Sequence, residues 1–91
     1  MDSVSYYQYL TRVAGLRDNT SRSYLTYISQ AAKDMGLLED ALYKINSPSI
    51  LKQMQEKLKV ARKFAERPAR KQGDMMSAYE QLVNFATTQR S

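Results

Sequence analysis

The sequence contains neither cysteine nor histidine. Without cysteine, these residues cannot form disulfides, Cys-ligated zinc sites or thiol nucleophiles. Without histidine, they lack the most common general base near neutral pH and the most common transition-metal ligand. Pairs of a nucleophile with histidine and two-histidine metal sites are therefore excluded. We predict no metal and no cofactor.

Glycine and paired carboxylates are also scarce. The three glycines, Gly15, Gly36 and Gly73, stand alone, so there is no glycine-rich phosphate loop. Glu39 and Asp40 are the only adjacent carboxylates, and neighbours on a helix point away from each other. A tyrosine nucleophile needs positioned arginine and usually histidine or lysine around it. We therefore predict that this protein is not an enzyme.

No apolar run is longer than a few residues, so the sequence predicts no membrane-spanning segment. The first residues have neither the basic start nor the apolar segment of a signal peptide. We expect a cytoplasmic protein. A reducing compartment is compatible with the absence of cysteine.

Alternating strand patterns and hairpin turns are absent, whereas apolar residues recur at three- and four-residue steps. This spacing predicts an all-α fold, and we expect residues 1–91 to form one compact orthogonal bundle. The sequence predicts four main helices at about 3–14, 19–35, 48–66 and 74–88, with a short helical turn near 38–45.

The helix at 19–35 is the one around which we expect the others to pack. Asn19-Thr20 offers a side-chain cap at its start, and Gly36 can close its end. Ser3 or Ser5 is the expected cap of the first helix.

Other signals place the later helix ends. Gly15 is expected to end the first helix, and Ser47-Pro48 predicts the start of the third. Pro68 and Gly73 are expected to interrupt the chain before Asp74 caps the last helix.

The apolar stripes predict which side chains face the core. Val4 and Val13 on the first helix, Ile50 on the third and Leu38 in the short turn belong to these stripes, with Phe85 flanking the last one.

The net charge of +5 is unevenly distributed. Residues 52–71 hold eight basic and two acidic side chains, a local balance of +6, whereas residues 1–51 are neutral. The simpler interpretation is that the charged side chains of residues 52–71 form a solvent-exposed helix face. The functional interpretation is contact with a polyanion such as a nucleic-acid backbone, because Arg67, Arg70 and Lys71 cluster in the loop before the last helix. A membrane-surface role for the predicted helix at 48–66 is a weaker hypothesis than these two, because the apolar stripe of this helix is needed for the core.

The start of the helix at 19–35 is a second candidate anion site. Arg17, Thr20 and Arg22 lie beside backbone N–H groups that have no partner inside the helix.

Several short motifs resemble the helical core-binding (SAM-like) domain of tyrosine recombinases and phage integrases. Tyr6-x-x-Tyr9-Leu10, Gly15-Leu16 and Thr20-x-x-x-Tyr24 resemble its opening, and the stretch 70–86 resembles its fourth helix. A similar helical unit precedes some HNH and restriction-type nucleases. The resemblance implies a DNA clamp and, by position, phosphate contacts from Arg17, Thr20, Arg22, Arg70, Lys71 and Gln72.

Two functional hypotheses follow. The first is a non-catalytic module that contacts double-stranded DNA through Arg17, Thr20, Arg22, Lys63, Arg67, Arg70, Lys71 and Gln72. The second is a protein-interaction module, such as a phage or host inhibitor or adaptor, that uses exposed Tyr7, Tyr27 and Tyr43 as anchors. The sequence leaves the oligomeric state open.

Overall fold

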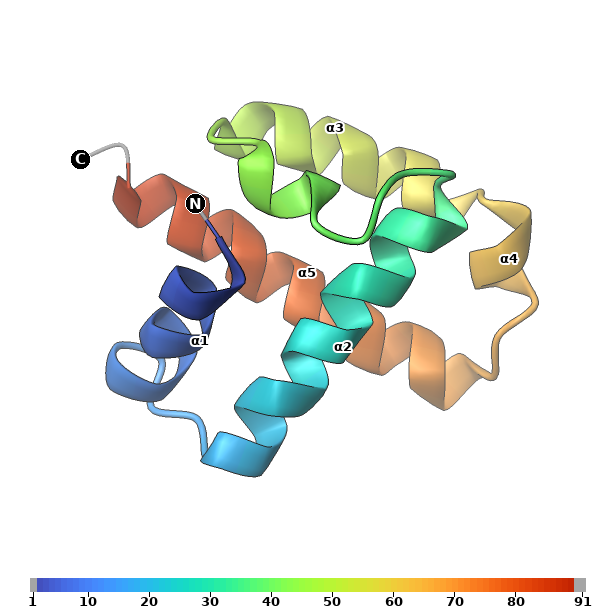
Figure 1. The fold of residues 1–91 in the computed structure, drawn as a ribbon. Helices are drawn as coiled ribbons and strands as arrows, with labels where there is room; N and C mark the ends of the chain where they lie inside the picture. Colours follow the sequence, from blue (N-terminus) through green and yellow to red (C-terminus); the bar gives the residue numbers. More distant parts are fainter. Residues whose placement is uncertain (1, 90–91) are drawn as a thin grey trace.

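Residues 2–89 form five α-helices and one 3₁₀ turn (Figure 1). The computed structural model describes residues 2–89, and Met1, Arg90 and Ser91 lie outside the described part. Helical residues make up 77% of the structure, and residues 2–89 contain no strand. The predicted all-α class with four main helices is confirmed. The elements are α1 (Ser3–Arg12), α2 (Asp18–Asp34), η1 (Ala41–Lys44), α3 (Pro48–Lys59), α4 (Arg62–Ala65) and α5 (Ala69–Gln89).

Two helices, α2 and α5, hold the others together. α5 passes behind α2 in Figure 1 and contacts α1, α2 and α3, while α2 also contacts α1, η1 and α4. The shortest dimension of the Cα trace is 18 Å, which is about two helix spacings of 8–10 Å. The domain therefore has two layers, and the core lies between α5 and the other main helices. The buried residues of α5 are Met75, Ala78, Tyr79, Leu82, Val83, Phe85 and Ala86.

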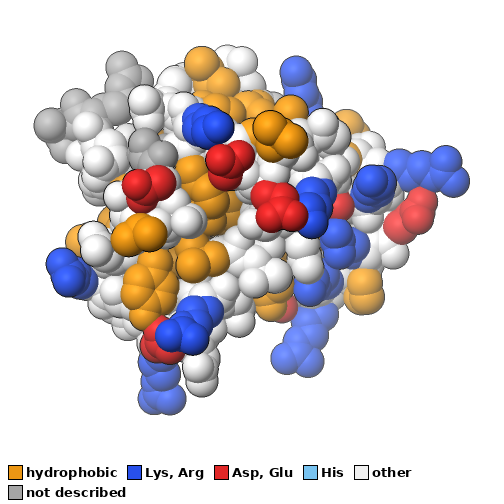
Figure 2. Space-filling view, in the orientation of Figure 1, with side chains coloured by type: hydrophobic (Ala, Val, Ile, Leu, Met, Phe, Trp, Pro, Cys, Tyr) orange, Lys and Arg blue, Asp and Glu red, His pale blue; other side chains and the backbone are white. Residues whose placement is uncertain are grey.

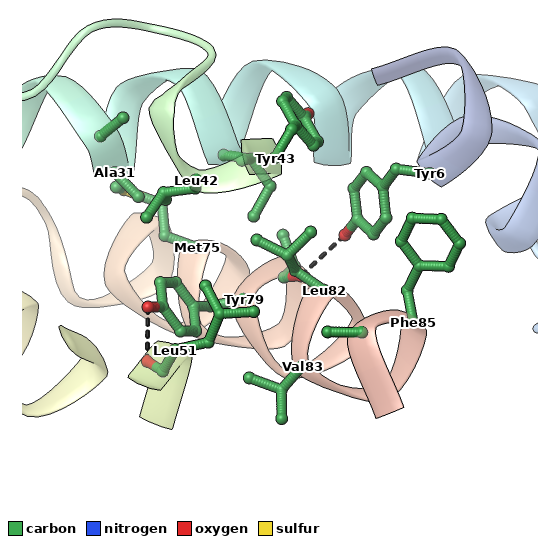
Figure 3. Close-up of a cluster of buried hydrophobic side chains, with 14 of the residues drawn as sticks. Tyr6, Ala31, Leu42, Tyr43, Leu51, Met75, Tyr79, Leu82, Val83 and Phe85 are labelled. Atoms are coloured by element: carbon green, nitrogen blue, oxygen red, sulfur yellow. Dashed lines mark hydrogen bonds between the residues drawn. The ribbon is translucent and has the colours of Figure 1, made fainter. Parts of the chain in front are cut away.

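Two buried tyrosines join α1 and α3 to α5 (Figure 3). The Tyr6 hydroxyl donates to the carbonyl of Ala78 at 2.7 Å, and the Tyr79 hydroxyl donates to the carbonyl of Leu51 at 2.6 Å. Both rings are fully buried, and each polar tip has a partner, as burial of a hydroxyl requires. These two bonds fix how α1 and α3 sit on α5.

The prediction that Tyr43 is an exposed anchor is wrong. The η1 turn carries its ring inward, where it is 3% exposed and its centroid lies 5.7 Å from that of Tyr6. Its neighbour Leu42 is buried in the same core. A large aromatic ring gains more free energy from this burial than from water contact.

The predicted helix at 48–66 is divided into α3 and α4. Ala61 has an extended backbone, with φ −68° and ψ 134°, and separates the two. On a continuous helix, Phe64 would lie about 120° around the axis from the buried Leu58. The break turns Phe64 into the core instead, where it is 4% exposed. Tertiary packing therefore overrides the helical pattern at this point.

The last helix begins at Ala69, five residues earlier than predicted, and Gly73 lies inside it. Pro68 precedes its first turn, and the N–H of Gln72 donates to the Pro68 carbonyl at 3.0 Å. Proline is tolerated at a helix start because the missing N–H would have no helical partner there. Asp74 is consequently a residue of the second turn and not the cap.

The caps of the first two helices also differ from the prediction. Asp2, rather than Ser3 or Ser5, caps α1 by accepting from the N–H of Ser5 at 2.7 Å. Arg17 precedes α2 without a side-chain cap bond, so Asn19 and Thr20 fall inside the first turn.

The glycine predictions hold for the turns after α1 and α2. Gly15 and Gly36 have φ values of +73° and +77°, in the left-handed region that glycine enters at little cost.

Several apolar side chains assigned to the core lie at the surface. Val4, Val13 and Leu38 are more than half exposed, and Ile50 is 49% exposed. Phe85, expected to flank the core, is 3% exposed and packs its ring near those of Tyr6 and Tyr9. Leu38 lies in the turn before η1, so Leu42 rather than Leu38 closes that end of the core, with Ile45 packed against it.

Candidate nucleic-acid interface

Lys and Arg side chains gather over the end of the molecule that holds α4 and the start of α5 (Figure 2). Residues 62–72 contribute five basic side chains, of Arg62, Lys63, Arg67, Arg70 and Lys71, and one acidic side chain, that of Glu66. The local charge of this segment is therefore +4. We call residues 62–72 the basic corner.

The backbone of the basic corner is held by Gln72. Its side-chain amide donates to the carbonyls of Ala65, at 3.2 Å, and of Arg67, at 2.8 Å. These carbonyls lie at and just past the end of α4, where helix carbonyls lack partners. Gln72 was predicted to contact DNA, but its amide is occupied in joining α4 to α5.

The start of α5 exposes backbone donors. The bond from the Gln72 N–H to Pro68 is the first of the helix, so the N–H groups of Ala69, Arg70 and Lys71 precede the hydrogen-bond ladder. The first turn contains no acidic residue. The positive end of the helix dipole therefore coincides with two cationic side chains.

Arg67, another predicted DNA contact, is bound inside the protein. Its Nε and Nη2 lie 2.8 and 2.9 Å from the two carboxylate oxygens of Asp34 in α2. The Asp34 side chain is 1% exposed and that of Arg67 27% exposed. This bond raises the pKa of Arg67 further above its ordinary value. Because the guanidinium group of Arg67 is already bound to the Asp34 carboxylate, Arg67 does not belong to the candidate interface.

Lys71 is positioned by an aromatic ring. Its Nζ lies 5.0 Å from the centroid of Tyr27 in α2, within the range of a cation–π contact. Tyr27 is partly buried, and its ring lies 6.2 Å from that of Tyr24. The first turn of α5 is thus tied to the middle of α2, and the ammonium is held near the surface.

Three cations of the basic corner have no ion-pair partner among residues 2–89: Lys63, Arg70 and Lys71. Arg62 by contrast pairs with Glu66 at 2.9 Å. Asp74, one turn beyond Arg70, makes no ion pair with it in this structure. Lys63 and Arg70 are exposed and Lys71 is partly buried, so all three can approach an external anion.

The start of α2 is a poorer anion site than the sequence suggested. Asp18 lies in its first turn, pairs with Arg22 at 3.2 Å and accepts a hydrogen bond from the Tyr7 hydroxyl of α1. The Tyr7 bond and the Arg22 charge lower the pKa of Asp18 below its ordinary value, so the carboxylate stays charged. This internal anion satisfies the helix dipole that an external phosphate would otherwise use.

The two predicted anion sites lie on different sides of α2. Arg22 and Tyr27 are five residues apart, which places them about 140° apart around the helix. Arg22 turns toward α1 through Asp18, and Tyr27 toward α5 through Lys71. Arg17 and Thr20 are exposed at the helix start, and no ion pair involves Arg17 within residues 2–89.

The other two tyrosines predicted as protein anchors also have internal contacts. Tyr7 is partly buried and donates to Asp18, which raises the pKa of its phenol. Tyr27 lies beside Lys71. Together with the burial of Tyr43, these contacts leave no freely projecting tyrosine of the predicted set.

The role of Asp34 was not predicted, although the helical period contains a signal for it. Tyr27 and Asp34 are seven residues apart, about two turns, so they share one side of α2. Both contact the basic corner.

Two searches of the described residues concern other kinds of site. Residues 2–89 contain no group of three or more acidic side chains placed to hold a metal ion. None of the helices described has the length and apolar character that crossing a bilayer requires.

Comparison with protein-family models, with curated proteins and with solved structures gave no significant match to this chain.

Proposed function

We propose that this protein is a helical module that binds double-stranded DNA through the phosphate backbone, with Lys63, Arg70 and Lys71 of the basic corner as the contact residues. The observation that carries the proposal is the start of α5. There the backbone N–H groups of the first turn precede the helical hydrogen bonds, and the side chains of Arg70 and Lys71 beside them have no ion-pair partner among residues 2–89. Helix starts of this kind bind phosphate oxygens through both charge and hydrogen bonds.

The arrangement favours binding without sequence readout. Long side chains at a helix start contact phosphates and sugars, which orient a duplex but carry no base information. Lys63 on α4 and Lys71 beside Tyr27 add two further cations to that of Arg70. The resemblance to core-binding domains of recombinases agrees with this proposal, because it too points to Arg70 and Lys71.

The test is fluorescence anisotropy of a labelled duplex of about 20 base pairs at several salt concentrations. Binding to wild-type protein should be in the micromolar range at low salt and should weaken steeply as salt rises. The double variant Arg70→Ala/Lys71→Ala should bind more weakly to every duplex and lower the salt slope by about two, one per lost phosphate contact. Circular dichroism should show unchanged helicity, because neither residue belongs to the hydrophobic core.

The control variant is Arg12→Ala, which removes a cation of α1 that lies near the other end of α5. Arg12 shares a surface hollow with Phe85 and Thr88, and Thr88 lies about 27 Å along α5 from Arg70. Arg12→Ala should leave affinity and salt slope close to wild type. Arg12→Ala removes one charge and the double variant removes two, so a loss in Arg12→Ala half as large as that in the double variant would reduce the effect to net charge and contradict a specific phosphate surface. A flat salt dependence of the wild-type protein would contradict it as well.

A further inference from the structure

A second surface feature borders the basic corner at Arg62. A hollow of about 560 Å³ opens between the end of α2 and the outer side of α3. The apolar part of its lining comes from Met35 and Leu37 on one side and from Ile50 and Met54 on the other, and Gln53 also lines it. The volume falls within the range of about 300–1,000 Å³ that is usual for ligand sites.

The apolar walls of this groove are exposed to solvent. Ile50 is 49% exposed and Leu37 is 37% exposed, although the helical stripe predicted Ile50 for the core. Met35 and Met54 are partly buried and pack against the core from the groove side. Methionine adapts its shape to different partners, and contiguous exposed apolar surface is typical of a binding site.

The charge around the groove has one sign. Lys57 and Arg62 line one end of it. No carboxylate among residues 2–89 pairs with Lys57, whereas Arg62, whose side chain is 93% exposed, pairs with Glu66, which does not line the groove. Of the described residues that line the groove, one is acidic, Asp34, and its carboxylate is 1% exposed and bound to Arg67. The groove therefore presents apolar walls and a cationic rim to a ligand.

We propose that this groove binds an acidic segment of a partner protein, with one or more apolar side chains seated between Ile50 and Met35 and carboxylates at Lys57 and Arg62. The charge at the rim selects an acidic ligand, and the apolar walls distinguish it from DNA, whose outer surface is phosphate. An amphipathic helix that places its apolar face in a groove is a common form of such recognition.

The experiment is a selection from a displayed library of random peptides of about 12 residues, long enough for three helical turns. Peptides are selected on the wild-type chain, and their affinities are then measured on variants. The proposal expects the enriched peptides to combine large apolar residues with Asp or Glu. Their affinity should fall at least tenfold with Lys57→Glu, which reverses the rim charge, and with Ile50→Ser, which removes one wall.

Lys52→Glu is the matched control. Lys52 lies on the same helix as Lys57, five residues away and therefore about 140° around the axis, and it does not line the groove. This variant should keep the wild-type affinity for the peptides. Arg70→Ala/Lys71→Ala should also keep it, so that failure of the peptide proposal and failure of the DNA proposal are separate results.

Three results would overturn the proposal. The first is that no enriched peptide is sensitive to Ile50→Ser. The second is enrichment of peptides without acidic residues, which would remove the role of Lys57. The third is concentration-dependent dimerisation in sedimentation that Ile50→Ser abolishes, because a second copy of the chain would then be the occupant of the groove. Ile50 is half exposed and outside the core cluster, so Ile50→Ser should fold normally by circular dichroism.

Discussion

Asp34 is a buried carboxylate with one ion-pair partner among residues 2–89, Arg67. Both of its oxygens accept from Arg67, and water has almost no access to them. The desolvation penalty of such a carboxylate is offset only while the arginine is present. The pair therefore fixes the loop between α4 and α5 against the end of α2.

Arg67→Ala should lower the free energy of unfolding by about 3 kcal/mol, because it leaves the Asp34 carboxylate buried without its partner. Urea unfolding at neutral pH, followed by circular dichroism, measures this change. Adding Asp34→Asn to Arg67→Ala should recover part of the loss, since the amide carries no charge.

Arg62→Ala is the comparison at the surface. Arg62 also pairs with a carboxylate, that of Glu66, but its side chain is 93% exposed. Its removal should cost less than about 0.5 kcal/mol, as for other exposed pairs. If the two arginine variants were equally stable, burial would not be what gives the Arg67 pair its importance.

At the scale of elements, α5 tolerates a glycine that a sequence pattern treats as a break. Gly73 lies in the second turn of a helix of 21 residues and has open space around the position of a Cβ atom. Glycine inside a helix costs up to about 1 kcal/mol relative to alanine, mainly through backbone entropy. Packing of the following turns of α5 against α1, α2 and α3 exceeds this cost.

Gly73→Ala should therefore raise the free energy of unfolding by about 0.5–1 kcal/mol, measured by denaturant unfolding. Gly36→Ala should have the opposite sign and lower it by about 1 kcal/mol, because φ at this position is +77° and a Cβ atom is strained there. A destabilised Gly73→Ala variant would contradict the continuous α5 described above.

The elements that sequence alone predicts well are those whose apolar stripe coincides with the buried face. The stripe of α5 is of this kind, since Met75, Tyr79 and Leu82 are all fully buried. The break at Ala61 was not predictable in the same way, because it depends on where Phe64 must point in three dimensions.

Much of the candidate site was not predictable for the same reason. Arg67 and Arg70 look equivalent in a basic run, and only the position of Asp34, 33 residues earlier, distinguishes them. A charge pattern identifies the segment with excess cations, whereas the choice of the cations left free depends on tertiary contacts.

At the scale of the whole molecule, buried phenols connect the stability of the fold to alkaline pH. Burial raises the pKa of Tyr6, Tyr43 and Tyr79 well above the ordinary value, because the charged phenolate is poorly solvated in the core. In the unfolded chain these groups titrate near pH 10. Above about pH 10 the unfolded chain therefore loses protons that the folded protein keeps. The contribution of these phenols to the free energy of unfolding is fully present below about pH 10 and is lost as the pH rises above it.

The free energy of unfolding should fall above about pH 10 by up to about 1.4 kcal/mol per pH unit for each of these tyrosines. Urea unfolding at a series of pH values, with tyrosinate absorbance as a second signal, measures the slope. Tyr6→Phe should be less stable at neutral pH by about 1 kcal/mol, because it loses the bond to the Ala78 carbonyl, but its alkaline slope should be shallower. A stability that stays constant up to about pH 11 would mean that these phenols ionise without unfolding.

The hydrogen bond from Tyr6 to Ala78 spans 72 residues of chain, and this has a consequence for synthesis on the ribosome. α1, α2 and α3 all emerge before α5, yet each buries apolar side chains against it. Their apolar faces therefore remain without a partner while the nascent chain grows, and the long-range contacts form late. The native fold can therefore form only after α5 has been synthesised. A premature stop codon before Ala69 would yield a chain that contains the sequences of the earlier helices but lacks the helix against which they pack.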